Sequence, residues 1–164
     1  MREAVILNYA IVDLGSNTIR LSVYRILPEG NDELLFSKKE MAGLVNYIID
    51  GVLSSEGILR ACSILMKFCE LLGQFRIKEM HVFATASPRN IRNTEEAVQT
   101  IHRVVGIDVE VLSGSLEAEL GYYGALLMDT VCGCLCKKEL YVSRSGVREG
   151  YLYHELLKEE RRPE

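Results

Sequence analysis

The spacing of the apolar residues changes near residue 54, and this change constrains the fold more than any other feature of the sequence. Before it, apolar and β-branched residues form short runs over 10–12, 19–26 and, more weakly, 33–39. Such runs between turn-forming residues are typical of β-strands. After residue 54, apolar residues recur at steps of three and four, as on one face of a helix. The chain is therefore predicted to open with an antiparallel meander and then to turn to helices.

Helices and strands are predicted to alternate after the meander. Helices are expected from a cap at Ser54 or Ser55 to a stop at Gly73, from Thr94 to Gly106, and onward from a cap at Ser113 or Ser115, with strands over 80–84 and 107–112 between them. The order β-β-β-α-β-α-β-α predicts an α/β domain of the ribonuclease-H-like class. A further strand over 140–143 and a charged helix over 147–161 are predicted to follow.

The overall charge gives the chain no general attraction to anionic partners. Its formal net charge is −4, which argues against nucleic acid or an anionic membrane surface as a partner. No apolar run approaches the ~20 residues that span a bilayer, and no export signal is evident, so a cytoplasmic location is expected. Cys132, Cys134 and Cys136 alternate, without the spacing of a zinc knuckle. Because the net charge is negative, any anion site would have to depend on local geometry.

The segment from Asp13 to Asn17 combines a carboxylate with a turn. Asp13 stands near the end of an apolar run, and Gly15, Ser16 and Asn17 follow it. Glycine allows a ligand to approach the backbone, and successive turn N–H groups can bind an anion. Asp13 could hold Mg²⁺ against that anion, because hard cations prefer oxygen ligands. The alternative is an ordinary hairpin turn with an Asx-type cap, which the spacing alone favours.

Two further residues are candidates for the same chemistry. Arg89 lies in a loop after the predicted strand over 80–84, and its guanidinium suits phosphate oxygens. The alternative is a solvated loop arginine. Glu117 lies in the first turns of the third helix, where the helix dipole favours the ionised carboxylate that takes a proton from water. The alternative is a charge at a helix start, which is common. Arg20 and Arg92 are weaker candidates.

Taken together, four segments resemble one protein family. They are AIVDLGSNTIRLSVYRI at 10–26, FATASPRNIRN at 83–93, VLSGSLEAELGYYGA at 111–125 and YVSRSGVREGYLYHEL at 141–156. In this order they resemble the Ppx/GppA phosphatase family, within the actin-like ATPase superfamily. The resemblance implies a shortened member, with a ribonuclease-H-like N-terminal domain over 1–128 and a remnant of the family's second domain, a strand and a helix, over 129–164.

The resemblance also implies a role for each candidate. Asp13 would hold the divalent metal, with Mg²⁺ as cofactor, and Gly15, Ser16 and Asn17 would form the first phosphate loop. Arg89 would contact substrate phosphate, and Glu117 would be the base that activates water. The implied reaction is hydrolysis of a terminal phosphoanhydride in polyphosphate or guanosine pentaphosphate.

The sequence departs from the family pattern in two ways. Leu116 and Glu119 stand where the family often has an acidic residue and an arginine. The family's second phosphate loop, an Asp-Ile-Gly-Gly-Gly-Ser-like segment, does not follow Glu117. In the superfamily, the substrate lies in a cleft between two domains, and each domain supplies one phosphate loop. With only one of these domains, the anhydride would stay solvated and the electrostatic stabilisation would be weaker. A homodimer, or a partner chain that completes the cleft, is therefore expected to be favoured.

Three hypotheses about function follow from the sequence. The first is a phosphoanhydride hydrolase. The second is a non-catalytic module that binds a phosphate-rich ligand or depends on a partner, and the third is a stable remnant without a role. Among enzymes, an actin-like kinase or ATPase is the next alternative, but no adenosine-binding segment is recognisable.

Overall fold

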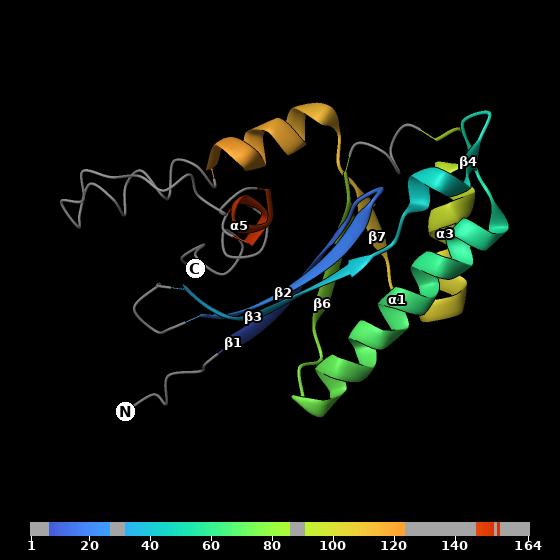
Figure 1. Cartoon of the computed structure of the whole chain (residues 1–164). Coiled ribbons are helices and arrows are strands. Elements are labelled where there is room, and N and C mark those ends of the chain that lie inside the picture. The colour runs from blue at the N-terminus through green and yellow to red at the C-terminus, as the bar shows by residue number, and fades with distance from the viewer. Residues whose placement is uncertain (1–6, 27–31, 86–90, 124–146, 153, 155–164) are drawn as a thin grey trace, which may run out of the picture. The chain divides into compact units, whose positions relative to one another are not determined.

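A computed structural model describes residues 7–26, 32–85, 91–123, 147–152 and 154 of the chain (Figure 1). The contacts divide the chain into two compact units, Met1–Leu112 and Ser113–Glu164. The predicted domain boundary between residues 128 and 129 and the predicted strand over 140–143 lie outside the described residues. Both stay predictions.

The first unit is built on a five-stranded mixed sheet in the order β3-β2-β1-β6-β7. The strands are β1 (Leu7–Leu14), β2 (Thr18–Ile26), β3 (Asp32–Met41), β6 (Met80–Ala84) and β7 (Val109–Val111). β1, β2 and β3 pair antiparallel, which confirms the predicted meander, and a bulge interrupts the β2–β3 register beside Val23. β6 pairs parallel with β1, and β7 with β6.

Two helices, α1 (Ser55–Gln74) and α3 (Thr94–Val105), lie side by side on one face of this sheet (Figure 1). The predicted cap of α1 is confirmed, because the Oγ of Ser54 accepts a hydrogen bond from the N–H of Gly57 at 3.2 Å. α3 ends at Gly106, which adopts the left-handed conformation at φ 79° that glycine favours.

The predicted stop of α1 at Gly73 is wrong. The helix continues to Gln74, and the left-handed residue that follows is Arg76, at φ 57°. The carbonyl of Leu72 accepts the N–H groups of Phe75 and Ile77, at 3.1 and 3.0 Å. These bonds satisfy the last turn of the helix without a glycine cap.

The main core lies between the sheet and these two helices. Alternate residues of β1 and β2 face the helices, as expected for strands with one side against a core. The buried cluster includes Ala10, Val12, Leu14, Ile19, Leu21, Val23, Ile58, Leu65, Phe68, Leu72, Ala97 and Ile101. The four- and three-residue steps of α1 thus bring its apolar stripe onto the sheet.

A small hairpin and a 3-10 helix connect β3 to α1, and the sequence analysis did not predict them. The 3-10 helix η1 (Leu44–Tyr47) leads into β4 (Ile48–Ile49), which pairs antiparallel with β5 (Val52–Leu53). The two turn residues, Asp50 and Gly51, have φ values of 51° and 73°. Positive φ at both positions is the geometry that an Asp-Gly pair favours in a two-residue hairpin.

The opposite face of the sheet carries a half-buried histidine, His81 of β6, whose Nε2 atom is buried. Its ring lies 6.1 Å from the ring of Tyr9, centroid to centroid, and its Nε2 has no hydrogen-bond partner among the described residues. Burial lowers the pKa of His81, because desolvation penalises the charged ring, although Glu79 and Glu110 oppose this effect. The imidazole is thus held in its neutral form to lower pH than an exposed histidine.

The second unit contains a helix over 114–123 and α5 (Val147–Tyr151). Gly150 packs directly on the first helix, so closely that a Cβ there would lie 1.9 Å from the carbonyl oxygen of Leu120. The ring of His154 stacks on Tyr123 at 4.8 Å, and its Nε2 lies 3.7 Å from a carboxylate oxygen of Glu119. Within the described ranges, no helix is both long enough and apolar enough to cross a membrane.

Candidate functional site

The candidate segments follow the carboxyl ends of three parallel strands in the first unit. β1, β6 and β7 run parallel, with Leu14 in register with Ala84, and Ala84 with Val111. The turn over 15–17 follows β1, the segment that contains Arg89 follows β6, and the helix over 114–123 begins three residues after β7. The carboxyl edge of a parallel sheet is the usual ligand position in α/β proteins.

The turn over 15–17 is tight at its start. The N–H of Gly15 donates to the carbonyl of Thr18 at 3.1 Å, which closes the connection between β1 and β2. A Cβ at Gly15 would lie 2.9 Å from the same carbonyl oxygen, so a larger residue would force the turn open. Gly15 therefore gives the turn its shape, and its own N–H is already engaged.

The segment after β3 holds the turn from outside. The N–H groups of Ala42 and Gly43 both donate to the carbonyl of Asn17, at 2.9 and 3.0 Å, and that of Val45 donates to the carbonyl of Ser16 at 3.2 Å. Three amides of one segment thus fix two consecutive carbonyls of the turn.

These bonds also decide where the N–H groups of the turn point. Each peptide unit is planar and trans here, so its N–H points opposite to its C=O. The N–H of Asn17 shares a unit with the carbonyl of Ser16, and that of Thr18 with the carbonyl of Asn17. Because the 42–45 segment binds both carbonyls, both N–H groups point away from it. Two neighbouring N–H groups with one direction are suited to bind an anion.

Asp13 lies one residue before the end of β1 and is partly exposed. Its register partners are Arg20 on β2 and Phe83 on β6, so it projects from the face opposite to α1 and α3. Among the described residues, no three His, Cys, Asp or Glu side chains form a metal cluster. A single carboxylate at the start of the candidate turn is compatible with Mg²⁺, which uses one or two carboxylates together with waters and substrate oxygens.

Arg89 lies outside the described residues, but the segment just after it is firmly held. The amide of Asn93 accepts from the N–H of Leu53 and donates to its carbonyl, both at 2.9 Å, in the manner of a paired strand. The N–H of Arg92 donates to the carbonyl of Gly51 at 2.7 Å. The β4–β5 hairpin therefore anchors the chain where it enters α3.

Glu117 belongs to the second unit, and its side chain is partly exposed. Ser113 caps its helix as predicted, because its Oγ accepts the N–H of Leu116 at 3.1 Å, while its carbonyl accepts the N–H of Glu117 at 2.9 Å. Glu117 thus lies in the first turn, where the helix dipole stabilises a carboxylate.

Sequence reasoning missed the residues that support the site. The roles of the 42–45 segment and of Asn93 depend on contacts between distant segments, and no local pattern reveals them. The hairpin had a signal, because Asp50-Gly51 stands between pairs of apolar residues.

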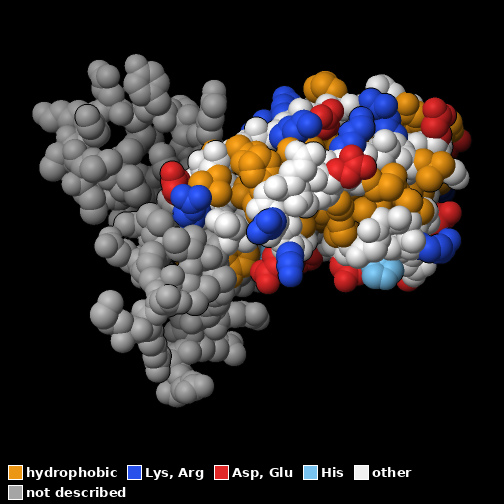
Figure 2. Space-filling view, turned by 90° about the horizontal axis from the view of Figure 1, so that it is seen from below, with side chains coloured by type: hydrophobic (Ala, Val, Ile, Leu, Met, Phe, Trp, Pro, Cys, Tyr) orange, Lys and Arg blue, Asp and Glu red, His pale blue; other side chains and the backbone are white. Residues whose placement is uncertain are grey.

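The face of the molecule in Figure 2 carries Lys and Arg side chains interspersed with Asp and Glu, with hydrophobic side chains between them. Charges of both signs alternate on this face, so its field has no single direction.

The sequence model of the Ppx/GppA phosphatase family matches residues 28–127. The chain belongs to this family. The first segment of the resemblance, at 10–26, lies before the matched range. A guanosine-5'-triphosphate,3'-diphosphate pyrophosphatase of Pseudoalteromonas translucida is 31% identical over 116 residues, which are 71% of this chain and 23% of the relative. The chain therefore spans about a quarter of that relative.

Solved structures of the family share the fold. A Ppx/GppA family member of Aquifex aeolicus superposes with a TM-score of 0.68 at 24% identity, over 76% of this chain and 40% of the other. An exopolyphosphatase of Cytophaga hutchinsonii gives a TM-score of 0.67 at 29% identity, over 74% of this chain and 39% of the other. The predicted fold class, an actin-like ATPase domain of the α/β type, is confirmed.

Proposed function

We propose that this chain binds the terminal phosphate of polyphosphate or guanosine pentaphosphate at the turn over 15–17 and takes part in its hydrolysis. The observation that carries the proposal is the orientation of the turn, whose carbonyls are bound by the 42–45 segment so that the N–H groups of Asn17 and Thr18 point the other way. Family membership supplies the reaction class, because the relatives above are named as a pyrophosphatase and an exopolyphosphatase.

Each residue has one task in this proposal. The N–H groups of the turn and the hydroxyl of Ser16 hold the phosphate oxygens, and Arg89 adds a planar pair of donors. Asp13 would hold a divalent cation such as Mg²⁺, which neutralises charge on those oxygens when bound. Glu117 accepts a proton from water as the water oxygen bonds to the terminal phosphorus. The anhydride P–O bond then breaks, its electron pair stays on the bridging oxygen of the shortened chain, and the terminal phosphoryl group is released as orthophosphate.

A second function, phosphate binding without turnover, is favoured by one observation. The sequence has no second glycine-rich phosphate loop after Glu117. Removal of one major donor from a site that stabilises a developing charge costs about 10²–10³ in rate. In this alternative the turn over 15–17 is retained, and catalysis requires a partner chain or a second copy.

The deciding experiment measures both binding and turnover. Release of phosphate from polyphosphate and guanosine pentaphosphate is followed with Mg²⁺ and after chelation, and binding of non-hydrolysed imidodiphosphate is measured by calorimetry. Glu117→Gln is compared with Glu119→Gln, a matched control on the same helix two residues on. The hydrolase proposal expects release to fall about a hundredfold or more in Glu117→Gln alone.

The outcomes separate the two functions. Binding by the turn without release by any variant supports the binding module and overturns the hydrolase. Neither binding nor release overturns both. Equal loss of release in both glutamate variants would contradict the role given to Glu117.

A further inference from the structure

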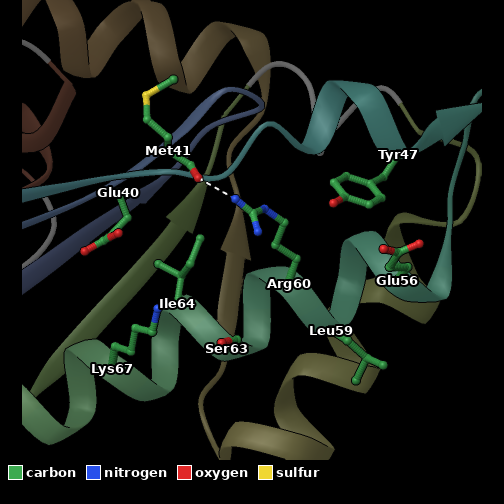
Figure 3. Close-up of a pocket in the computed structure, with 9 residues that line it drawn as sticks. All are labelled: Glu40, Met41, Tyr47, Glu56, Leu59, Arg60, Ser63, Ile64 and Lys67. Carbon is green, nitrogen blue, oxygen red and sulfur yellow. Dashed lines mark hydrogen bonds between the residues drawn. The ribbon is translucent and has the colours of Figure 1, made fainter.

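A pocket of about 370 Å³ lies between the end of β3 and α1, and Arg60 is at its centre (Figure 3). Its lining residues are Glu40, Met41, Tyr47, Glu56, Leu59, Arg60, Ser63, Ile64 and Lys67. The guanidinium of Arg60 reaches from α1 toward the backbone at the end of β3, as the dashed line in Figure 3 shows. The arginine therefore binds the protein's own backbone.

Arg60 makes two charge-assisted hydrogen bonds to consecutive carbonyls. Its Nε donates to the carbonyl of Ala42 at 2.5 Å, and its Nη2 donates to that of Met41 at 2.9 Å. A guanidinium is planar and presents its donors in a fixed fork, so two bonds of this kind fix the orientation of both peptide units.

The peptide units that Arg60 binds are the ones that hold the turn. The carbonyl of Met41 shares a unit with the N–H of Ala42, and the carbonyl of Ala42 with the N–H of Gly43. Both of these N–H groups donate to the carbonyl of Asn17. A charge that polarises a carbonyl also strengthens the hydrogen bond of the N–H in the same unit. The path therefore runs from Arg60 through two peptide units to one carbonyl of the turn.

We propose that Arg60 is a positioning residue for the phosphate-binding turn and acts through the backbone of Met41, Ala42 and Gly43. This inference rests on the proposed function, in which the turn over 15–17 binds phosphate. Arg60 does not bind the turn itself. It binds the segment after β3, which in turn binds the carbonyls of the turn. Its loss would free the peptide units after β3 and let the turn N–H groups lose their common direction.

The alternative role for Arg60 is to bind a ligand in this pocket. The lining mixes acidic side chains, such as Glu56, with basic ones, such as Lys67, and Arg60 already has two backbone acceptors. A ligand that used the guanidinium would have to displace those carbonyls. The observations therefore favour support of the turn over recognition of a small molecule.

The test compares three variants by amide hydrogen exchange and by binding of inorganic tripolyphosphate with Mg²⁺. Arg60→Met keeps the apolar stem and removes the donors, whereas Arg60→Lys keeps a charge that can donate to one carbonyl. Lys67→Met removes a charge from the same helix and the same pocket and is the matched control. Exchange is read at the amides of Ala42 and Gly43, with Leu21 of β2, an interior strand of the sheet, as the reference for global unfolding.

We expect Arg60→Met to raise exchange at Ala42 and Gly43 by about tenfold relative to Leu21, and to weaken tripolyphosphate binding by about three- to tenfold. Arg60→Lys should recover part of both effects, and Lys67→Met should change neither. If Arg60→Met raises exchange at Leu21 by the same factor, the arginine acts on global stability and the proposal is overturned. The proposal is also overturned if exchange at Ala42 and Gly43 rises selectively while binding stays the same.

A different result is expected if the turn does not bind phosphate. The wild-type chain then does not bind tripolyphosphate at all, whereas the exchange rates still show whether Arg60 fixes the segment that holds the turn. Exchange at Ala42 and Gly43 that is equal in Arg60→Met and Lys67→Met would refute the positioning role, with or without binding.

Discussion

Replacement of Asn93 by alanine tests whether the β4–β5 hairpin is an integral part of the site's support. The Asn93 amide makes two hydrogen bonds of 2.9 Å to the N–H and carbonyl of Leu53, a residue that is only 6% exposed. At a net value of about 1 kcal/mol each, their loss costs about 2 kcal/mol. The third contact, 3.3 Å from Glu96, is exposed and adds little. For a chain of this size, the expected fall in Tm is about 4–8 °C.

The assay is thermal unfolding followed by circular dichroism, with Asn46→Ala as control. Asn46 is an exposed asparagine of η1, just before β4, and its removal should change Tm by less than about 2 °C. Asn93→Asp keeps the acceptor for the Leu53 N–H but turns an oxygen toward the Leu53 carbonyl, so it should also destabilise. A Tm for Asn93→Ala equal to that of Asn46→Ala would refute the reasoning.

Three further substitutions test other contacts. Gly57→Ala should destabilise by about 1–3 kcal/mol, because its Cβ would lie 2.6 Å from the Cβ of Tyr47, whereas Gly73→Ala, which meets open space, should be neutral or stabilising in urea unfolding. Burial lowers the pKa of His81 below its usual 6.5, so the stability that its neutral ring confers is fully present above that pH and is lost as the pH falls. His81→Phe should therefore flatten the fall in Tm as the pH drops below 6.5, and an unchanged slope would contradict this. Gly150→Ala should speed trypsin cleavage after Arg148 in α5, because its Cβ would lie 1.9 Å from a backbone oxygen of the neighbouring helix, and an unchanged rate would disprove that contact.

Sequence patterns predicted those parts of the fold that depend on local periodicity. The strand over 80–84 is β6, the helix from Thr94 to Gly106 is α3 with its cap, and Ser54 and Ser113 cap the helices that follow them. Each of these depends on residues within a few positions of one another. The stop at Gly73 failed because a backbone bond to Leu72 from Ile77 closes α1 without a glycine cap.

The support of the candidate site was not predictable in the same way. Arg60 lies 18 residues from Ala42 in sequence, and Asn93 lies 40 residues from Leu53. Both side chains bind backbone atoms. Because every residue has the same backbone atoms, no sequence pattern identifies the partner. The roles of Asp13, Ser16 and Glu117 came from resemblance to a family, and they stay predictions until the assays above are made.

The way the turn is held determines which step of the reaction it can assist. Three N–H groups of the 42–45 segment fix its carbonyls before any ligand arrives, so its own N–H groups need little reorganisation to meet an anion. Preorganised donors increase affinity in any solvent, but their effect on a developing charge is large only where water is excluded. A turn in which Asn17 is exposed is therefore expected to bind phosphate by itself and to accelerate hydrolysis only when a second surface covers it. Affinity for tripolyphosphate that is independent of protein concentration, together with turnover that rises with it more steeply than linearly, would identify a second copy as that surface.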